Sequence, residues 1–286
     1  MVDVHLVTCR APVVEDADLV LLERALADRG IDARAVVWDD PGVDWAAAPV
    51  TIVRSTWDYT DRLAEFRAWI DVVAARSALW NPAPLLHWNA HKSYLLSLHA
   101  RGAPVVPTVV VTEGGAASLD AIGDAQDWDE VVVKPAVGVG ANGAGRFRRG
   151  DAAGQQHLDV SLTRGDVLVQ PFVDSIVTRG EVAIVRLDGA VTHAVCKRPA
   201  PHDYRVQENY GGRNELIDPT PVLVELAERV VGVLPVEPLY ARIDVVELAG
   251  TWHVLEVEVL EPSLWLDLAP PAALERFADA VVRRLP

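Results

Sequence analysis

The chain has 286 residues, half of them hydrophobic, and a formal net charge of -15. This acidic balance argues against a nucleic-acid-binding protein, because binding to phosphates needs a basic surface. No stretch of about 18 uncharged apolar residues occurs, so no membrane-spanning segment is expected. The two cysteines, Cys9 and Cys196, match neither a disulfide framework nor a zinc motif and are typical of a cytoplasmic protein.

The first part of the chain alternates between strand and helix patterns. A helix is predicted at Ala17–Arg29, where apolar residues recur at helical spacing and Gly30 provides a stop signal. Strands are predicted at Val2–Thr8, Ala33–Trp38 and Val50–Val53. Strands and helices that alternate with short connections predict an open parallel α/β sheet.

The sequence RSTWDY, Arg54–Tyr59, follows the third predicted strand directly. Ligands of open α/β sheets lie beyond the carboxyl ends of the strands. Arg54 and Tyr59 are therefore candidate substrate contacts, and the guanidinium suits an anionic group. The alternative is that Arg54 pairs with Asp58 or Asp61 and only fixes the loop.

A helix is predicted at Leu63–Ala75, and the proline-rich sequence that starts at Trp80 indicates a domain boundary. The next helix is predicted at Asn89–Arg101, with Lys92 in its first turn. A cation is disfavoured there by the helix dipole, and a bound anion would compensate for it. Lys92 is thus either a phosphate ligand or an ordinary surface lysine. A short strand is predicted at Pro104–Val111.

Lys134 lies near the end of a valine-rich strand, Trp128–Val137, where a buried ammonium would need a partner. The glycine-rich sequence Gly138–Arg146 follows and exposes backbone N–H groups suited to phosphate. Its GxGxxG glycines are Gly138, Gly140 and Gly143. No helix pattern follows, so this is not a dinucleotide-binding fingerprint. The segment is either a phosphate-binding lid or a flexible hairpin tip.

Further along, a strand is predicted at Val167–Val173, and Gly180–Leu187 with Ala190–Val195 predicts a hairpin. The segment Cys196–Gly212 is long, cationic and irregular, which is usual for functional or disordered segments. Helices are predicted at Thr220–Val233 and Leu274–Arg284.

Arg242–Pro262 predicts two strands joined by a glycine-containing turn and interrupted by carboxylates. Glu256 and Glu258 are two residues apart and therefore point to one face, and Asp244 on the neighbouring strand could approach them. Carboxylates this close repel one another unless a cation holds them, and oxygen ligands suit Mg²⁺ or Mn²⁺. The alternative is a hairpin with one acidic, solvated face.

Four segments, in their order and spacing, resemble the ATP-grasp superfamily, and within it the glutathione synthetase and RimK-like ligases. These segments are Val131–Arg146, Val169–Glu181, Lys197–Gly212 and Ala241–Pro262. The resemblance implies an α/β fold in which an N-terminal open parallel α/β domain precedes two α+β lobes that sandwich ATP. The implied domains are 1–85, 86–174 and 175–286.

The resemblance also implies roles for individual residues. Those implied for ATP binding are Lys92, Lys134, Gly138, Gly140, Gly143, Gln170, Pro171, Phe172, Val173 and Glu181. The catalytic cations are Arg205, Arg242 and Lys197. The ligands of two Mg²⁺ ions are Asp244, Glu256 and Glu258, where Glu258 replaces an asparagine common in the family. The substrate contacts are Arg54, Tyr59, Gly211 and Gly212.

The implied reaction is ligation of a carboxylate to an amine, with ATP forming an acyl phosphate on a small amino-acid-like substrate. The alternatives are a phosphotransferase and a nucleotide-binding module without turnover. RSTWDY and YRVQENYGGR resemble a smaller group of ligases that includes the O-ureido-serine cyclo-ligase of D-cycloserine biosynthesis. Homodimers are common among such ligases.

Overall fold

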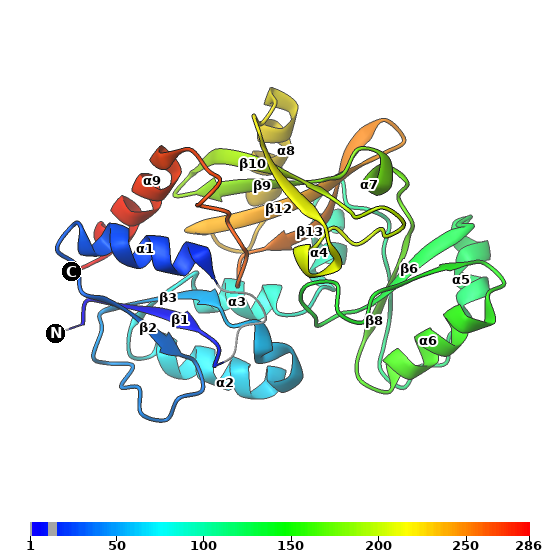
Figure 1. Ribbon diagram of the computed structural model, residues 1–286. Helices are drawn as coiled ribbons and strands as arrows, with labels where there is room; N and C mark the ends of the chain where they lie inside the picture. The colour runs from blue at the N-terminus through cyan, green and yellow to red at the C-terminus, as the bar shows by residue number, and fades with distance from the viewer. Residues whose placement is uncertain (1, 11–15) are drawn as a thin grey trace.

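The computed structural model describes residues 2–10 and 16–286, and it contains three β-sheets that follow one another along the chain (Figure 1). The lobe that contains β6, β8, α5 and α6 projects to one side of the molecule in this view. The predicted α/β class is confirmed. The predicted division into domains 1–85, 86–174 and 175–286 stays a prediction.

The N-terminal sheet has four strands in the order β2-β1-β3-β4, and all of its pairs are parallel, as predicted. Its strands are β1 (Val4–Thr8), β2 (Ala33–Val37), β3 (Val50–Ser55) and β4 (Ala78–Trp80). Its helices are α1 (Ala17–Ala27), the 3-10 helix η1 (Trp57–Arg62) and α2 (Leu63–Ala74). The strand β3 continues two residues beyond its predicted end, so Arg54 lies inside the sheet.

The second sheet has the order β5-β8-β6-β7 and is antiparallel throughout. Its strands are β5 (Val109–Val111), β6 (Glu130–Pro135), β7 (Gly145–Arg148) and β8 (Val167–Pro171). Its helices, α5 (Leu119–Gln126) and α6 (Ala152–Leu162), were not predicted. They bury Leu119, Leu158 and Leu162 against the valines of the sheet.

The third sheet has five antiparallel strands in the order β11-β10-β9-β12-β13. Its strands are β9 (Glu181–Leu187), β10 (Ala190–Arg198), β11 (Arg213–Ile217), β12 (Tyr240–Leu248) and β13 (Thr251–Glu258). Its helical elements are α7 (Ser175–Thr178), η2 (Glu208–Tyr210) and α8 (Pro221–Val231). The predicted hairpins β9–β10 and β12–β13 are confirmed, whereas β11 was missed.

The helix predicted at Asn89–Arg101 is wrong in its first turn. The chain forms two short helices, α3 (Ala83–Asn89) and α4 (Tyr94–Ala100), and Lys92 lies in the turn between them. The Lys92 N–H donates to the Ala136 carbonyl (2.7 Å), at the end of β6. This tertiary hydrogen bond takes the place of a bond within a continuous helix.

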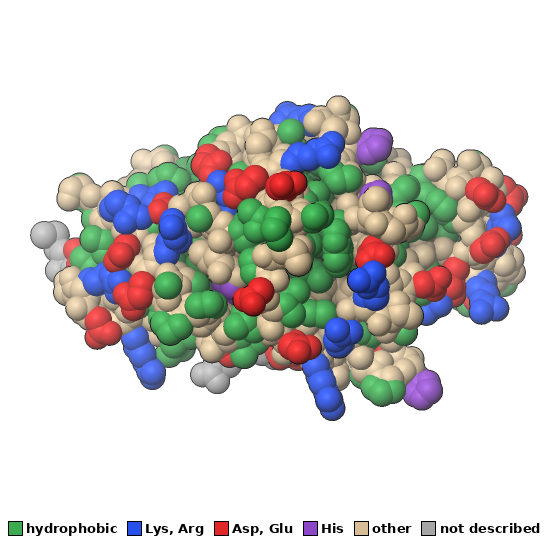
Figure 2. Space-filling view, turned by 90° about the horizontal axis from the view of Figure 1, so that it is seen from above, with side chains coloured by type: hydrophobic (Ala, Val, Ile, Leu, Met, Phe, Trp, Pro, Cys, Tyr) green, Lys and Arg blue, Asp and Glu red, His purple; other side chains and the backbone are tan. Residues whose placement is uncertain are grey.

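The last helix, α9 (Pro271–Val282), packs against α1, and the two share one core with the N-terminal sheet (Figure 1). The chain therefore returns to its first sheet after completing its third. Among the described residues, no helix is long and apolar enough to cross a membrane. On the face seen in Figure 2, cationic and acidic side chains are interspersed around hydrophobic ones.

Candidate active site

One cavity of about 660 Å³ is lined by residues of the second and third sheets and their loops, and by residues of α1 and η1 from the N-terminal domain. The hairpin loop between β6 and β7 forms one wall, and the segment 204–210 forms another. The strands β12 and β13 contribute carboxylates to it, and α1 and η1 of the N-terminal domain border it through Asp18 and Trp57. The cavity thus depends on contacts between segments that are distant in sequence.

Asp244, Glu256 and Glu258 lie together in this cavity, as the strand periodicity predicted. Asp244 on β12 is paired in register with Glu256 on β13, and Glu258 lies two residues further on the same face. One oxygen from each of the three carboxylates lies within 4.8 Å of the others. This is an all-oxygen donor set of the kind that Mg²⁺ prefers. The residues present therefore fit a divalent cation, although their role as its ligands stays a prediction.

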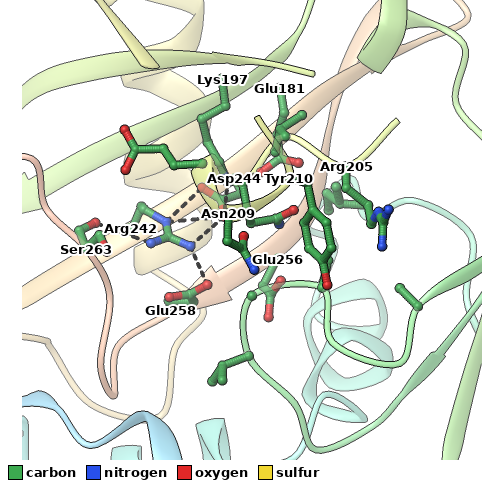
Figure 3. Close-up of a pocket in the computed structure, with 18 of the residues that line it drawn as sticks. Glu181, Lys197, Arg205, Asn209, Tyr210, Arg242, Asp244, Glu256, Glu258 and Ser263 are labelled. Carbon is green, nitrogen blue, oxygen red and sulfur yellow. Dashed lines mark hydrogen bonds and ion pairs between the residues drawn. The ribbon is translucent and has the colours of Figure 1, made fainter. Parts of the chain in front are cut away.

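Cations surround the three carboxylates (Figure 3). Arg242 contacts both Asp244 oxygens, through Nε to Oδ1 at 3.0 Å and Nη2 to Oδ2 at 2.9 Å, and it also contacts Glu258. Lys92 pairs with Glu256 at 2.9 Å. These ion pairs offset both the repulsion among the three carboxylates and the free-energy cost of burying them.

Burial acts on both Glu256 and Glu258, but their pKa values shift in opposite directions because different charged groups lie beside them. Burial raises the pKa of Glu258 to about 7, although Arg242 opposes the shift. Burial also opposes ionisation of Glu256, but Lys92 and Lys134 outweigh it and hold its pKa below the ordinary value. Glu256 is therefore held as a carboxylate by two lysines, and Glu258 is the more easily protonated of the two.

The two lysines predicted to bind phosphates meet at the same wall of the cavity. Lys92 Nζ donates to the Gly138 carbonyl as well as pairing with Glu256. Lys134 also lines the cavity, and no carboxylate of the described residues lies within 4.0 Å of its ammonium. Burial lowers the pKa of Lys134, and the negative charge of Glu256 opposes that shift. An ammonium without a direct partner suits an anionic ligand.

Lys197 lies on the other side of the acids. Its ammonium pairs with Glu181 and lies 3.5 Å from Asp244 Oδ2. Glu181, predicted to bind the ribose, thus contacts a predicted catalytic lysine. Arg205 belongs to the segment 204–210 and stacks on Tyr210, with its guanidinium carbon 3.6 Å from the ring centroid.

The glycine-rich loop and the end of β8, to which the resemblance assigns ATP binding, both contribute residues to the cavity. Gly138 and Gly140 line the cavity, whereas Gly143 lies beside Pro135 and has a positive φ of 74°. Of the residues assigned to adenine, Gln170, Pro171 and Val173 line the cavity. Phe172 is not among the lining residues, and the Arg146 guanidinium carbon lies 3.4 Å from its ring centroid.

The structure does not bring Arg54 to the cavity. Its side chain is 1% exposed, and Nη2 donates to the Pro262 carbonyl (2.9 Å) and lies 3.6 Å from Asp18 Oδ2. It therefore pairs with neither Asp58 nor Asp61. Arg54 was expected after the strand but lies within β3, which explains why it pairs with neither acid. This position does not support direct contact with a substrate.

The other predicted substrate contacts lie behind the cavity wall. Tyr59 is buried, and burial together with the negative charge of Glu261 raises the pKa of its hydroxyl well above the ordinary value. Gly211 and Gly212 follow η2. A Cβ on Gly212 would lie 2.0 Å from the Val206 carbonyl oxygen, so this glycine allows two parts of the segment to pass closely.

Several lining residues had no predicted role. They come from the start of α1, from η1 and from the segment after β13, and they include Asp18, Trp57, Glu261, Ser263 and Trp265. Glu261 was visible in the sequence as an additional carboxylate close to Glu256 and Glu258, but without an assigned role. The backbone of Trp265 has a positive φ of 49°, which is unusual for a bulky residue and which no sequence pattern indicated.

Comparisons with known proteins agree with this geometry. Residues 4–81 match the family described as D-cycloserine synthetase DcsG, N-terminal domain, and residues 99–268 match the prokaryotic glutathione synthetase ATP-grasp domain. The chain is 32% identical to the cycloserine biosynthesis protein DcsG of Streptomyces lavendulae, over 98% of each protein.

Solved structures give the same result. The crystal structure of D-cycloserine synthetase DcsG has a TM-score of 0.90 at 31% identity, over 99% of each chain. D-alanine–D-alanine ligase from Bacillus anthracis has a TM-score of 0.72 at 12% identity, over 99% of this chain and 97% of the other. A RimK domain ATP-grasp protein from Sphaerobacter thermophilus reaches 0.69 at 21%, over 98% and 99%. The last two show a shared fold. From these matches and the cavity, we conclude that the chain belongs to the ATP-grasp ligases, a family that uses ATP and Mg²⁺.

Proposed function

We propose that this ligase cyclises O-ureido-D-serine to D-cycloserine, using ATP and two Mg²⁺ ions. The observation that carries the proposal is one cavity that joins three convergent carboxylates to Lys92 and Lys134, in a chain similar over its whole length to DcsG. The second ion, the use of Mn²⁺, a homodimer and a cytoplasmic location are further expectations from the family.

The first step is phosphoryl transfer to the substrate carboxylate. A carboxylate oxygen bonds to the γ-phosphorus of ATP, the bond from that phosphorus to the ADP oxygen breaks, and an acyl phosphate forms. Lys92 and Lys134 bind the phosphates, and Arg242 and Arg205 lie near the transferring group and compensate its charge. Magnesium held by Asp244, Glu256 and Glu258 would supply further charge compensation.

The second step closes the ring. The ureido nitrogen that is bonded to oxygen attacks the acyl carbon, the carbon–oxygen bond to phosphate breaks, and the nitrogen loses its proton. Water then adds to the carbamoyl carbon, the bond from that carbon to the ring nitrogen breaks, and the ring nitrogen takes up a proton. D-Cycloserine remains, and the released carbamic acid decomposes to CO₂ and ammonia. Segment 204–210 lines the cavity beside the acids and is placed to limit water access to the acyl phosphate.

The test is ADP release from ATP and Mg²⁺ with O-ureido-D-serine, followed by mass spectrometry of the product. We expect ADP and D-cycloserine in equal amounts, and no ADP release with D-serine, which lacks the ureido group. A stable phosphorylated product would favour the phosphotransferase instead. ATP binding without turnover of O-ureido-D-serine would contradict the proposal.

A further inference from the structure

The segment 259–266, which follows β13, is held by side chains of the N-terminal domain, from α1 and η1. Asp18 accepts hydrogen bonds from the N–H groups of Leu264 (2.6 Å) and Leu266 (2.7 Å). Trp57 Nε1 donates to the Glu261 carbonyl (3.0 Å). The backbone of this segment is thus fixed, and it presents the Glu261 side chain at a defined place in the cavity.

Glu261 is a buried carboxylate without a cation. Its side chain lines the cavity although the residue is only 5% exposed. Asp244, Glu256 and Glu258 each pair with Arg242 or Lys92, whereas no cation of the described residues lies within 4.0 Å of Glu261. A carboxylate in such surroundings is stabilised when a positively charged group joins it.

Glu261 does not belong to the metal-binding set. The three acids whose oxygens lie within 4.8 Å of one another are Asp244, Glu256 and Glu258. Glu261 stands three residues beyond them, after the strand has ended. Its place in the cavity therefore calls for a different cation.

The surroundings suit an organic ammonium group. Two indoles line the same cavity as Glu261. Trp265 follows Glu261 by four residues, and Trp57 donates through Nε1 to the Glu261 backbone carbonyl. Trp265 faces cations already, because the Arg242 guanidinium carbon lies 5.2 Å from its ring centroid. A carboxylate with aromatic neighbours is a common environment for a bound ammonium.

We propose that Glu261 binds the α-ammonium group of the amino-acid substrate. This assignment rests on the proposed function, in which the carboxylate of the same α-carbon is phosphorylated beside Asp244, Glu256 and Glu258. The ammonium and the substrate carboxylate are bonded to the same carbon, so the distance between them is nearly fixed. By binding the ammonium beside the metal-binding acids, Glu261 can orient the substrate carboxylate that reacts. Glu261 would thus select substrates that carry a free α-amino group.

The test compares two substrates and two variants. The substrates are O-ureido-D-serine and 3-(ureidooxy)propanoate, which lacks only the ammonium. For the native enzyme, we expect kcat/KM to fall about 100-fold when the ammonium is removed, as for other buried charge pairs. In Glu261→Gln, the ureido-serine reaction should fall by a similar factor, mainly through KM, and removal of the ammonium should then matter less than about 3-fold.

The matched control is Asp267→Asn, the same chemical change at an exposed carboxylate that borders the same cavity. It should keep the native discrimination between the two substrates. If Glu261→Gln is too slow to measure, calorimetric titration of both substrates into the complex with Mg²⁺ and a non-hydrolysable ATP analogue gives the same comparison.

The outcomes separate this assignment from the proposed function. The role of Glu261 alone would be overturned if the native enzyme converts O-ureido-D-serine and Glu261→Gln still discriminates between the two substrates as strongly as the native enzyme does. A shift of more than about 10-fold in the Mg²⁺ concentration that this variant needs would make Glu261 a metal ligand and would also overturn it. Failure of the native enzyme to use O-ureido-D-serine would instead overturn the proposed function, and this assignment with it.

Discussion

Replacing Asp18 by asparagine should destabilise the protein by about 3 to 5 kcal/mol. Asp18 is 4% exposed, accepts N–H groups at 2.6 and 2.7 Å, and lies 3.6 Å from the Arg54 guanidinium. Asparagine offers one acceptor oxygen in place of two and no charge. The loss of a charge-assisted hydrogen bond costs about 1.5 to 3 kcal/mol, and breaking a buried ion pair costs about 3 to 5 kcal/mol. The two losses overlap, so we do not add them.

Urea denaturation followed by circular dichroism measures this change. With a slope of about 3 kcal/mol per molar urea, the midpoint should fall by roughly 1 to 1.7 M. The control is Asp32→Asn, which breaks the exposed pair with Arg34 and should leave the urea midpoint almost unchanged. In a background with Arg54→Met, the cost of Asp18→Asn should shrink, because no buried cation is left unpaired. A loss below about 1 kcal/mol, or an equal loss in both backgrounds, would refute this reasoning.

Three further predictions follow from other parts of the structure. Glu256→Gln removes a central carboxylate of the proposed metal site, so it should lower ADP release by about 100-fold or more and should raise the Mg²⁺ concentration that gives half-maximal activity. Burial lowers the pKa of His193 in the folded protein. As the pH falls below about 6.5, His193 therefore takes up a proton more readily in the unfolded chain than in the folded one. Stability should therefore fall between pH 7.5 and 5.5 in thermal unfolding, and less so in His193→Gln. A new Cβ in Gly180→Ala would lie 2.8 Å from Cys196 Sγ at a φ of 93°, so melting should show a loss of about 2 to 4 kcal/mol. Gly189→Ala, at a φ of 82° with no atom within 4 Å, should lose only about 1 to 2 kcal/mol, and equal losses would contradict the clash.

The sequence by itself determined the parts of the site that depend on local periodicity. The two-residue repeat of a strand places Glu256 and Glu258 on one face, and a short hairpin brings Asp244 opposite them. The strand that carries Lys134 and the glycine-rich loop after it were likewise visible, because strand pattern and glycine content are local properties. The parallel sheet of the N-terminal domain followed from the alternation of strands and helices.

Only the tertiary structure decided which residues meet across the domains. Lys92 reaches Glu256 because a hydrogen bond from its N–H to Ala136 breaks the expected helix. Trp57 and Glu261 meet although they are 204 positions apart, and no local pattern encodes such a contact. Arg54 likewise looked like a substrate contact at a strand end, but β3 is longer and turns its side chain into the interior. Periodicity determines which face of an element a side chain occupies, and packing between elements decides what that face meets.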